Sequence, residues 1–488
     1  MPIVAKWTLP ILHNTIEFVS RTSDFHDWLM SMCQQYQGKS FVLRVLGQPD
    51  IVVLCTPESV EDVMKTHFES FPKGDTVYEA MGDMFGGGLF ASDGDQWAHQ
   101  RKVASNLFTA RKLRETMTES IRKHTIVLRR MLEEAAGQDK TVDLFKLFNR
   151  FTIEAFAEIG FGIRMNSMES ADEHPFQTAF DRVQRATVLR FVRPSWFWKL
   201  QRLVQVGVER QLRQDINTID GTVLDIISQS IQRRQLGENQ RDGADLVSLV
   251  LDYNEKTPEA KSGEFDPHYL RDIVVNFLIA GRDTTAQALS WFFKNVGTHP
   301  EVVTKIRAEI KHVLPGLMDG SIETPTMEQV QQLTFLEAAI KESLRLYPAV
   351  PVSFRVAAND VVLSDGTFIR KGQSVAVPVY GCSRMNYLWG PDAASYNPER
   401  WFDPVSGKLI HFPSHKFFAF SAGPRVCLGM NLALLELKIV LASLLSRLDV
   451  EVLEPGNVTY DFSLTLPVRG ELLGRISLHI AQTEKANA

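Results

Sequence analysis

The strongest constraint on the fold is a long central stretch, residues 95–345, in which apolar residues recur mainly with helical spacing. Many of these helices would carry dense Arg, Lys and Glu on one face, and one of them, residues 269–294, is unusually long. Strand and helix signals do not alternate regularly, which argues against a doubly wound parallel sheet. We therefore predict a mainly α protein with a minor β portion.

The strand signals flank this central stretch. Thr56 and Pro57 have the residue types of a cap and a first helical residue, so a helix should begin there. The Asp365-Gly366 pair predicts a tight turn within a hairpin. The predicted strands are residues 41–46, 51–55, 361–363, 367–370, 375–380, 450–453 and 473–480, and an apolar helix is predicted over residues 428–445.

Composition excludes some classes of protein. The net charge of -5 gives no reason to expect a nucleic-acid partner. Four cysteines in 488 residues, none in a C-x-x-C pair, are not a disulfide framework and predict a reducing compartment. Cys33, Cys55 and Cys382 are expected to be buried small apolar residues. No apolar run of about 18 residues occurs, so the chain as given is not expected to span a membrane.

The fourth cysteine, Cys427, stands in the segment Phe420-Ser-Ala-Gly-Pro-Arg-Val-Cys-Leu-Gly429, just before the predicted apolar helix. The beginning of a helix favours a thiolate, because its N–H groups and positive dipole end stabilise an anion. Gly423 and Gly429 allow the backbone to approach a neighbour closely. A cysteinate of this kind, as an axial ligand, pushes electron density onto a haem iron and favours O–O cleavage.

Three further motifs precede this segment. Ala280-Gly-Arg-Asp-Thr-Thr285 lies inside the long helix, where Gly, Asp and Thr are locally unfavourable, as expected where function overrides propensity. Spacings of three and four residues place Glu342 with Arg345, and Trp97 with Arg101, on shared helical faces.

The segment that contains Cys427 resembles the haem-binding loop of the cytochrome P-450 superfamily, F-x-x-G-x-R-x-C-x-G, and Phe420, Gly423, Arg425, Cys427 and Gly429 match its fixed positions. The other three motifs resemble further motifs of that family in the same order, and the resemblance covers roughly residues 35–482. It implies the cytochrome P-450 fold, a bound haem b and Cys427 as the iron ligand.

The resemblance also implies roles for the other motifs. Asp283 and Thr284 would handle protons for iron-bound dioxygen, while Ala280 and Gly281 would leave room over the haem. Glu342, Arg345 and Arg400 would form a structural network that braces the loop before Cys427. The residues expected near the haem propionates are Trp97, Arg101, Arg355 and Arg425.

Several segments are similar to the plant and protist fatty-acid hydroxylase clan, including residues 92–102, 189–194, 280–293 and 422–430. This likeness implies an oxygenase that hydroxylates long-chain fatty acids at or near the terminal carbon. The expected pocket is apolar: Met81, Met84, Phe85, Leu89, Phe90, Phe277, Leu278, Val352, Phe354, Leu464 and Leu466. The substrate carboxylate would be held far from the haem, near Arg190, Arg193 or Lys199.

Other functions remain open at this stage. A relative that rearranges hydroperoxides or uses peroxide would share the haem loop, although Asp283 and Thr284 argue against it. An oxygenase for another lipophilic substrate, such as a sterol or terpenoid, and a haem sensor are the remaining alternatives. The expected partners of the oxygenase are dioxygen and a separate NADPH-cytochrome reductase, since no flavin or nicotinamide domain is visible, and the chain is expected to be a monomer.

The N-terminal residues bear on localisation. Residues 7–12 resemble the stretch that follows the membrane-anchor helix of eukaryotic members. We therefore expect residues 1–34 to be an N-terminal segment and residues 35–488 a single haem domain. Either an anchor was removed, the chain is part of something longer, or this member binds membranes peripherally through residues 191–204. A full-length form with an anchor would face the cytosol on the endoplasmic reticulum.

Overall fold

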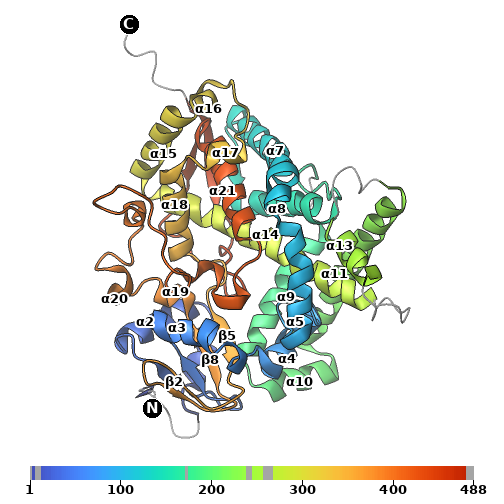
Figure 1. Ribbon diagram of the computed structural model, residues 1–488, viewed down its shortest axis with the longest axis vertical. Helices are drawn as coiled ribbons and strands as arrows, with labels where there is room; N and C mark the ends of the chain where they lie inside the picture. Colours follow the sequence, from blue (N-terminus) through green and yellow to red (C-terminus); the bar gives the residue numbers. More distant parts are fainter. Residues whose placement is uncertain (1–2, 6–11, 171–173, 238–244, 257–266, 480–488) are drawn as a thin grey trace.

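The computed structural model describes residues 3–5, 12–170, 174–237, 245–256 and 267–479. Helices dominate, and three small sheets accompany them, as predicted for a mainly α protein with a minor β portion. In Figure 1 the strands β2, β5 and β8 gather near the N-terminus, and most of the helices form a larger body beside them.

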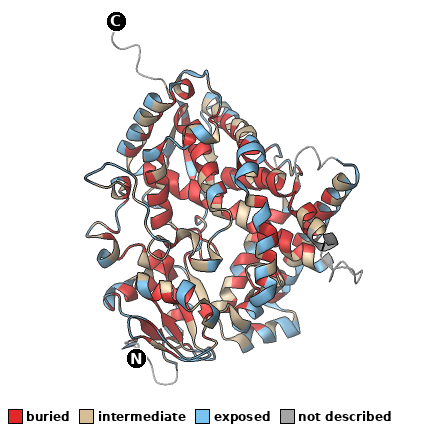
Figure 2. Ribbon diagram, in the orientation of Figure 1, coloured by how far each residue is buried: buried red, intermediate tan, exposed pale blue. Residues whose placement is uncertain are grey.

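The central element is α14 (Pro267–Gly297), which contains the long helix predicted at residues 269–294. It packs against α8 (Leu144–Phe161), α18 (Thr334–Leu346) and α21 (Met430–Leu445). From residue 273 to residue 293 of α14, every residue is buried except Ala280, Gly281 and Thr284. Figure 2 shows α14 and α21 as mostly buried elements in the middle of the molecule. Within this stretch of the helix, these three positions are the least enclosed by neighbouring elements.

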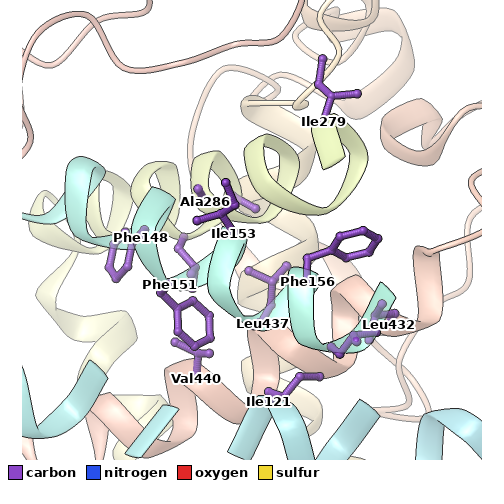
Figure 3. Close-up of a cluster of buried hydrophobic side chains, with 14 of the residues drawn as sticks. Ile121, Phe148, Phe151, Ile153, Phe156, Ile279, Ala286, Leu432, Leu437 and Val440 are labelled. Atoms are coloured by element: carbon purple, nitrogen blue, oxygen red, sulfur yellow. The ribbon is translucent and has the colours of Figure 1, made fainter. Parts of the chain in front are cut away.

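Aromatic side chains of α8 fill the space beside α14 and α21. Figure 3 shows Phe148, Phe151 and Phe156 in one cluster with Leu437 and Val440. The ring centroids of Phe148 and Phe293 of α14 lie 5.5 Å apart in a stacked arrangement. This dense packing fixes the position of α14 from its far side.

The largest sheet has the order β1-β2-β3-β8-β5. The hairpin predicted near residues 41–55 is confirmed as the antiparallel pair β2 (Phe41–Leu43) and β3 (Ile51–Val53). The strand predicted at residues 375–380 ends earlier, as β8 (Ser374–Val377), because Pro378 cannot continue the ladder. Its antiparallel partner β5 (Ser353–Val356) was not predicted as a strand.

The other two sheets are small. The Asp365-Gly366 turn joins β6 (Val361–Val362) to β7 (Phe368–Ile369), as predicted. The last two predicted strands are confirmed as β9 (Leu448–Val452) and β10 (Leu473–Leu478), and residue 480 lies outside the described residues. The third sheet also contains β4 (Thr141–Asp143), which was not predicted.

The remaining strand is β1 (Ile3–Val4), and the remaining elements are helical. They are α1 (Thr15–Ser20), α2 (Phe25–Gln35), α3 (Pro57–Glu61), η1 (Asp62–Thr66), η2 (Phe68–Ser70), α4 (Gly74–Phe85), α5 (Gly94–Ser105), η3 (Asn106–Phe108), α6 (Ala110–Lys112), η4 (Leu113–Met117), α7 (Thr118–Gly137), α9 (Pro175–Val192), α10 (Ser195–Val204), α11 (Gly207–Gln235), α13 (Leu246–Lys256), α15 (Pro300–Val313), α16 (Pro315–Asp319), α17 (Met327–Val330), α19 (Val379–Cys382), α20 (Asn386–Trp389), η6 (Pro398–Trp401), η7 (Phe418–Phe420) and η8 (Gly423–Arg425). The predicted cap of α3 is present, since the Thr56 side chain accepts a hydrogen bond from the Ser59 N–H.

The N-terminal elements share a core with the largest sheet. Phe18 of α1 and Phe25 of α2 belong to one buried cluster with Phe41 and Ala376. Most of the stretch at residues 7–12 lies outside the described residues. Among the helices in the described part of the chain, none combines the length and the apolar character needed to cross a bilayer.

The three other cysteines lie together beside the same core. Cys33 and Cys55 are buried, as predicted, with their sulfur atoms 3.4 Å apart. Cys382 is only partly buried, although it was also expected to be buried.

Candidate functional site

A cavity lies between α14 and the loop that contains Cys427. Its walls include Ala280, Gly281 and Thr284, the three open positions of α14, and the exposed surface of Cys427 faces it. A second cavity shares Ala280 and Thr284 with the first. The two cavities therefore adjoin each other beside α14.

The Cys427 loop is held by backbone contacts. The Cys427 N–H donates to the carbonyl oxygen of Phe420 at 2.9 Å, and both residues line the cavity. Gly423 has φ +63, and a Cβ atom there would lie 1.9 Å from the carbonyl oxygen of Met64. The close backbone contact predicted at Gly423 is therefore made with η1, which contains Met64. Gly429 also lines the cavity, directly before α21.

Two kinds of influence act on the Cys427 thiol. Burial raises its pKa, while the Gly429 N–H and the charge of Arg101 lower it. The contribution of the N–H group at the start of the helix thus has the expected direction, although burial is the larger effect. A bound metal ion deprotonates a coordinating thiol by its own charge.

The propionate candidates lie on one side of the cavity. Trp97 and Arg101 come from α5, Arg355 from β5, and Arg425 from η8, and all four line the cavity. Arg425 pairs with Asp93 at 2.5 Å, and its guanidinium lies 4.5 Å from the ring centroid of Trp97. Arg101 donates to the carbonyl oxygen of Val426 at 2.7 Å, which links α5 to the Cys427 loop.

Two of these arginines retain an unsatisfied donor. The buried Nε atoms of Arg355 and Arg425 have no hydrogen-bond partner among the described residues. Burial, and then the repulsion of Arg425, lowers the pKa of Arg355 to about 9, while burial lowers that of Arg425 to about 10. The site therefore favours an added anion that would accept from both groups.

Lys73, which the sequence motifs did not identify, adds a further cation. It precedes α4 and lines both cavities. Burial, followed by the charges of Arg355 and Arg425, lowers its pKa well below the ordinary value. Three basic groups thus lie near Asp93, with Glu69 as a weaker influence on Arg425, and this excess of basic groups fits the two carboxylates of a haem.

The α14 motif divides between two sides of the helix. Thr284 faces the cavity, and its hydroxyl donates to the carbonyl oxygen of Ala280 at 2.7 Å. Asp283 is buried and turned toward α9. Its carboxylate accepts a hydrogen bond of 2.5 Å from Gln184 of α9 and one of 2.8 Å from Arg282, the preceding residue of α14. Burial raises the pKa of Asp283 to about 6 although Arg282 opposes the change. The two motif residues therefore do not share a wall of the cavity.

A polar link connects Asp283 to the cavity indirectly. The Thr465 hydroxyl donates to the amide oxygen of Gln184 at 3.1 Å, and Thr465 lines the second cavity. Two side chains, Gln184 and Thr465, thus separate the carboxyl group from the cavity by this route.

Gly281 packs closely against α8 in addition to lining the cavity. A Cβ atom at this position would lie 2.0 Å from the Cγ atom of Phe156 in α8. Gly281 and Ala280 are both partly exposed, and both line the cavity beside Cys427. The expectation that they leave room over a haem stays a prediction.

The predicted network of Glu342, Arg345 and Arg400 is assembled. Arg345 donates two hydrogen bonds of 2.8 Å to Glu342, and both side chains have 0% exposure. Arg400 and the indole of Trp401 also donate to Glu342, at 3.2 and 3.0 Å. The ring centroids of Trp401 and Phe417 lie 4.8 Å apart, and Phe417 directly precedes η7. Through this contact the network supports the segment that leads to Cys427.

Most of the predicted pocket lines the two cavities: Met81, Phe85, Leu89, Phe90, Phe277, Val352, Phe354 and Leu464. Met84, Leu278 and Leu466 do not, because their side chains are packed in the hydrophobic core. Wall residues that the sequence did not reveal come from distant elements: Phe18, Phe25, His26, Val77, Val188, Phe191, Val192, Ile279 and Phe462.

The three cations proposed to hold a substrate carboxylate differ in their surroundings. Arg190 is buried and pairs with Glu209 at 2.5 Å and Asp83 at 2.8 Å, so its charge is already neutralised. Lys199 pairs with Glu79 at 2.7 Å. Arg193 borders a third cavity, beneath the start of α10. The expectation that Arg190 could hold the substrate carboxylate does not fit these two ion pairs.

Glu436 of α21 is a further cavity residue that the motifs did not identify. Its side chain is buried, and burial raises its pKa to about 8, although a hydrogen bond from Thr285 opposes the change. A protonated carboxyl group at neutral pH is therefore part of the wall. The sequence signal that could have found it is an acidic residue within an otherwise apolar helix.

The chain is similar to known proteins over most of its length. The family model described as Cytochrome P450 matches residues 5–470. Cytochrome P450 86B1 of Arabidopsis thaliana is 32% identical, over 92% of this chain and 81% of that protein. Cytochrome P450 704C1 of Pinus taeda is 34% identical, over 94% of this chain and 89% of that protein. Cytochrome P450 94A2 of Vicia sativa is 32% identical, over 88% of this chain and 83% of that protein.

Proposed function

Because the chain belongs to the cytochrome P450 family, we propose that it is a haem-thiolate monooxygenase that hydroxylates long-chain fatty acids at or near the methyl end. The observation that carries the substrate class is the second cavity, which adjoins the one beside Cys427 and has apolar walls rich in Phe and Val. Such walls hold an alkyl chain by apolar burial, worth about 0.8 kcal/mol for each CH₂ group.

Haem b would be held by Cys427 on the iron and by Lys73, Arg101, Arg355 and Arg425 at its propionates. When bound, it would supply the activation of dioxygen that these side chains cannot perform. Replacement of Cys427 by His tests the ligand. The ferrous–CO spectrum should lose its thiolate-type band, and an unchanged band would reject Cys427.

Thr284 would hold a proton at its hydroxyl beside the cavity, and Asp283 would supply protons from behind α14. The open position of Thr284 and the raised pKa of Asp283 support this division. Electrons would come from a separate NADPH reductase. Consumption of dioxygen that depends on reductase and NADPH separates this function from a hydroperoxide-rearranging enzyme and from a haem sensor.

The substrate class is tested by titrating the ferric Soret band with saturated acids of increasing length. Affinity should rise by up to about fourfold for each added methylene until the cavity is full, since 0.8 kcal/mol corresponds to about that factor. Constant affinity, or tighter binding of a compact polycyclic ligand than of any acid, would reject the fatty-acid proposal. The monooxygenase proposal would then still stand.

We also infer a peripheral membrane contact through α10, on the cytosolic face of the endoplasmic reticulum. In support, Trp196, Leu200 and Leu203 of α10 are 62%, 52% and 79% exposed. Leu46 lies in the adjacent β2–β3 turn and is also exposed. Sedimentation with phospholipid vesicles tests the contact. Leu200→Glu with Leu203→Glu should release the protein, whereas Val405→Glu, at a distant exposed position, should not.

A further inference from the structure

A series of hydrogen bonds between buried side chains ends at the Asp283 carboxylate. The Leu466 backbone N–H donates to the amide oxygen of Gln287 at 3.1 Å, and the amide nitrogen of Gln287 donates to the Thr465 hydroxyl at 2.8 Å. Thr465 donates to the amide oxygen of Gln184 at 3.1 Å, and Gln184 donates to Asp283 at 2.5 Å. Each of the four side chains is at most 5% exposed. The series therefore joins α9, α14 and the 463–466 segment inside the protein.

The direction of this series is fixed at its far end, because a backbone N–H can only donate. The Leu466 N–H occupies the oxygen of Gln287, so the NH₂ group of Gln287 faces Thr465. The single hydroxyl proton of Thr465 is then left for the oxygen of Gln184. The NH₂ group of Gln184 consequently faces Asp283. The order of donors and acceptors thus assigns the orientation of both amides, which their shape alone does not.

Both oxygens of the Asp283 carboxylate face donors. Arg282 donates to one oxygen at 2.8 Å, and Gln184 donates to the other. An ionised carboxylate only accepts hydrogen bonds and fits this arrangement, whereas a protonated one must place a hydrogen where a donor already points. Asp283 can hold a proton and keep Gln184 as a partner if the amide turns over. That turn leaves the Thr465 hydroxyl proton without its acceptor, which disfavours it.

Two charged groups among the described residues act on Asp283: Arg282 of α14 and Asp181 of α9, which are themselves paired at 2.7 Å. Burial raises the pKa of Asp283 to about 6 and Asp181 adds to the rise, while Arg282 and the hydrogen bond from Gln184 lower it. Arg282 is shared between two carboxylates, so its removal would disturb both. Gln184 is neutral, so its removal changes the hydrogen bonding of Asp283 without changing the net charge.

We propose that Gln184 is a positioning residue for Asp283: its amide holds the carboxylate as an acceptor, and Thr465 and Gln287 keep that amide from turning over. The inference rests on the proposed function, in which Asp283 supplies protons from behind α14, and it adds the side chains that decide at which pH Asp283 holds one. Loss of the Gln184 donor should raise that pH by about one unit, the size expected for a hydrogen bond to a charged group.

The first measurement does not depend on turnover. In the haem-loaded protein, the unfolding temperature of Asp283→Asn minus that of the wild type follows the titration of Asp283, because asparagine does not ionise. The folded-state pKa of about 6 lies above the ordinary 3.8, so the stability that this proton contributes is present at low pH and is lost as the pH rises to about 6. The difference should therefore rise up to a break at about pH 6 and stay constant above it. With Gln184→Met in both proteins, the break should move to about pH 7.

Two further variants accompany this measurement. Thr465→Val keeps Gln184 but removes the donor to its oxygen, so the break should move in the same direction by a smaller amount. Gln177→Met is the matched control on α9. Gln177 is 1% exposed, and neither of its amide atoms has a hydrogen-bond partner among the described residues. Its replacement should leave the break at about pH 6.

A break that stays at about pH 6 in Gln184→Met overturns the inference, and so does an equal upward movement in Gln177→Met. If Gln184→Met fails to retain haem, an unmoved break in Thr465→Val overturns it. Product formed per NADPH consumed, measured over the same pH range, tests the proposed function separately. A moved break with an unchanged product ratio supports the positioning role of Gln184 and rejects proton delivery by Asp283.

Discussion

The ring of Phe156 in α8 fills the place where a Cβ atom of residue 281 in α14 would lie, 2.0 Å from the Phe156 Cγ atom. This contact holds α14, which lines the Cys427 cavity, against the aromatic side chains of α8. Gly281 is thus a packing requirement within a helix where alanine would otherwise be favoured by about 1 kcal/mol.

Gly281→Ala should therefore destabilise the protein by about 1–3 kcal/mol, because the buried ring must shift. The second mutation Phe156→Ala should remove the clash, so the double variant should lose less stability than the sum of the two single variants. Thermal unfolding of the three variants measures this coupling, and additive effects would contradict the packing account.

Thr284→Ala should keep a normal haem spectrum but divert electrons from product to peroxide, because the hydroxyl beside the cavity is lost. Removal of a positioned proton-transfer group costs on the order of 10²-fold or more in rate. Asp283→Asn, which keeps a hydrogen-bonding partner for Arg282, should slow turnover with the same spectrum. The measurement is the ratio of product formed to NADPH consumed, and a wild-type ratio in Thr284→Ala would remove that residue from proton delivery.

Arg345→Ala should give little haem-loaded protein. It leaves the fully buried Glu342 without its bidentate partner, at a cost of about 3–5 kcal/mol. Arg475→Ala is the control, since its ion pair with Glu451 is exposed and worth about 1 kcal/mol at most. Haem content per chain is the measurement, and fully loaded but inactive Arg345→Ala would instead indicate a catalytic role.

Glu436 should make stability depend on pH. Its folded-state pKa of about 8 lies above its ordinary value, so the folded state holds a proton that the unfolded state releases above about pH 4.5. This contribution to stability is complete below about pH 4.5 and is lost as pH rises toward about 8. Glu436→Gln should unfold at a higher temperature than the wild type near pH 8 and at nearly the same temperature near pH 4.5. Equal midpoints near pH 8 would contradict the raised pKa.

The sequence predicted those parts of the molecule that depend on local patterns. The long helix, the two hairpins and the placement of Glu342 and Arg345 on one helical face follow from residue spacing, so they are present where they were expected. The burial of this pair does not follow from spacing. The strand β5 was missed because its four residues pair only with β8, and the β6–β7 hairpin lies between these two strands in the chain, so no tight turn marks the pair.

The cavity walls were predicted less completely. Met84 and Leu466 have the same apolar character as Met81 and Leu464, and only the three-dimensional packing decides which side chains reach the open space. Lys73 carries no motif, because its role depends on Arg355 and Arg425, which lie far away in sequence. Tertiary context of this kind leaves no local signal.

Elements near the start of the chain supply part of the substrate wall, through Phe18, Phe25 and His26. This part of the wall and the helix that contains Thr284 are separate pieces of polypeptide, more than two hundred residues apart. Exchange of residues 15–35 between relatives would therefore change one part of the cavity wall while α14 stayed untouched. The same residues also belong to the buried cluster that α1 and α2 share with the largest sheet, so a change in them acts on stability as well as on the cavity.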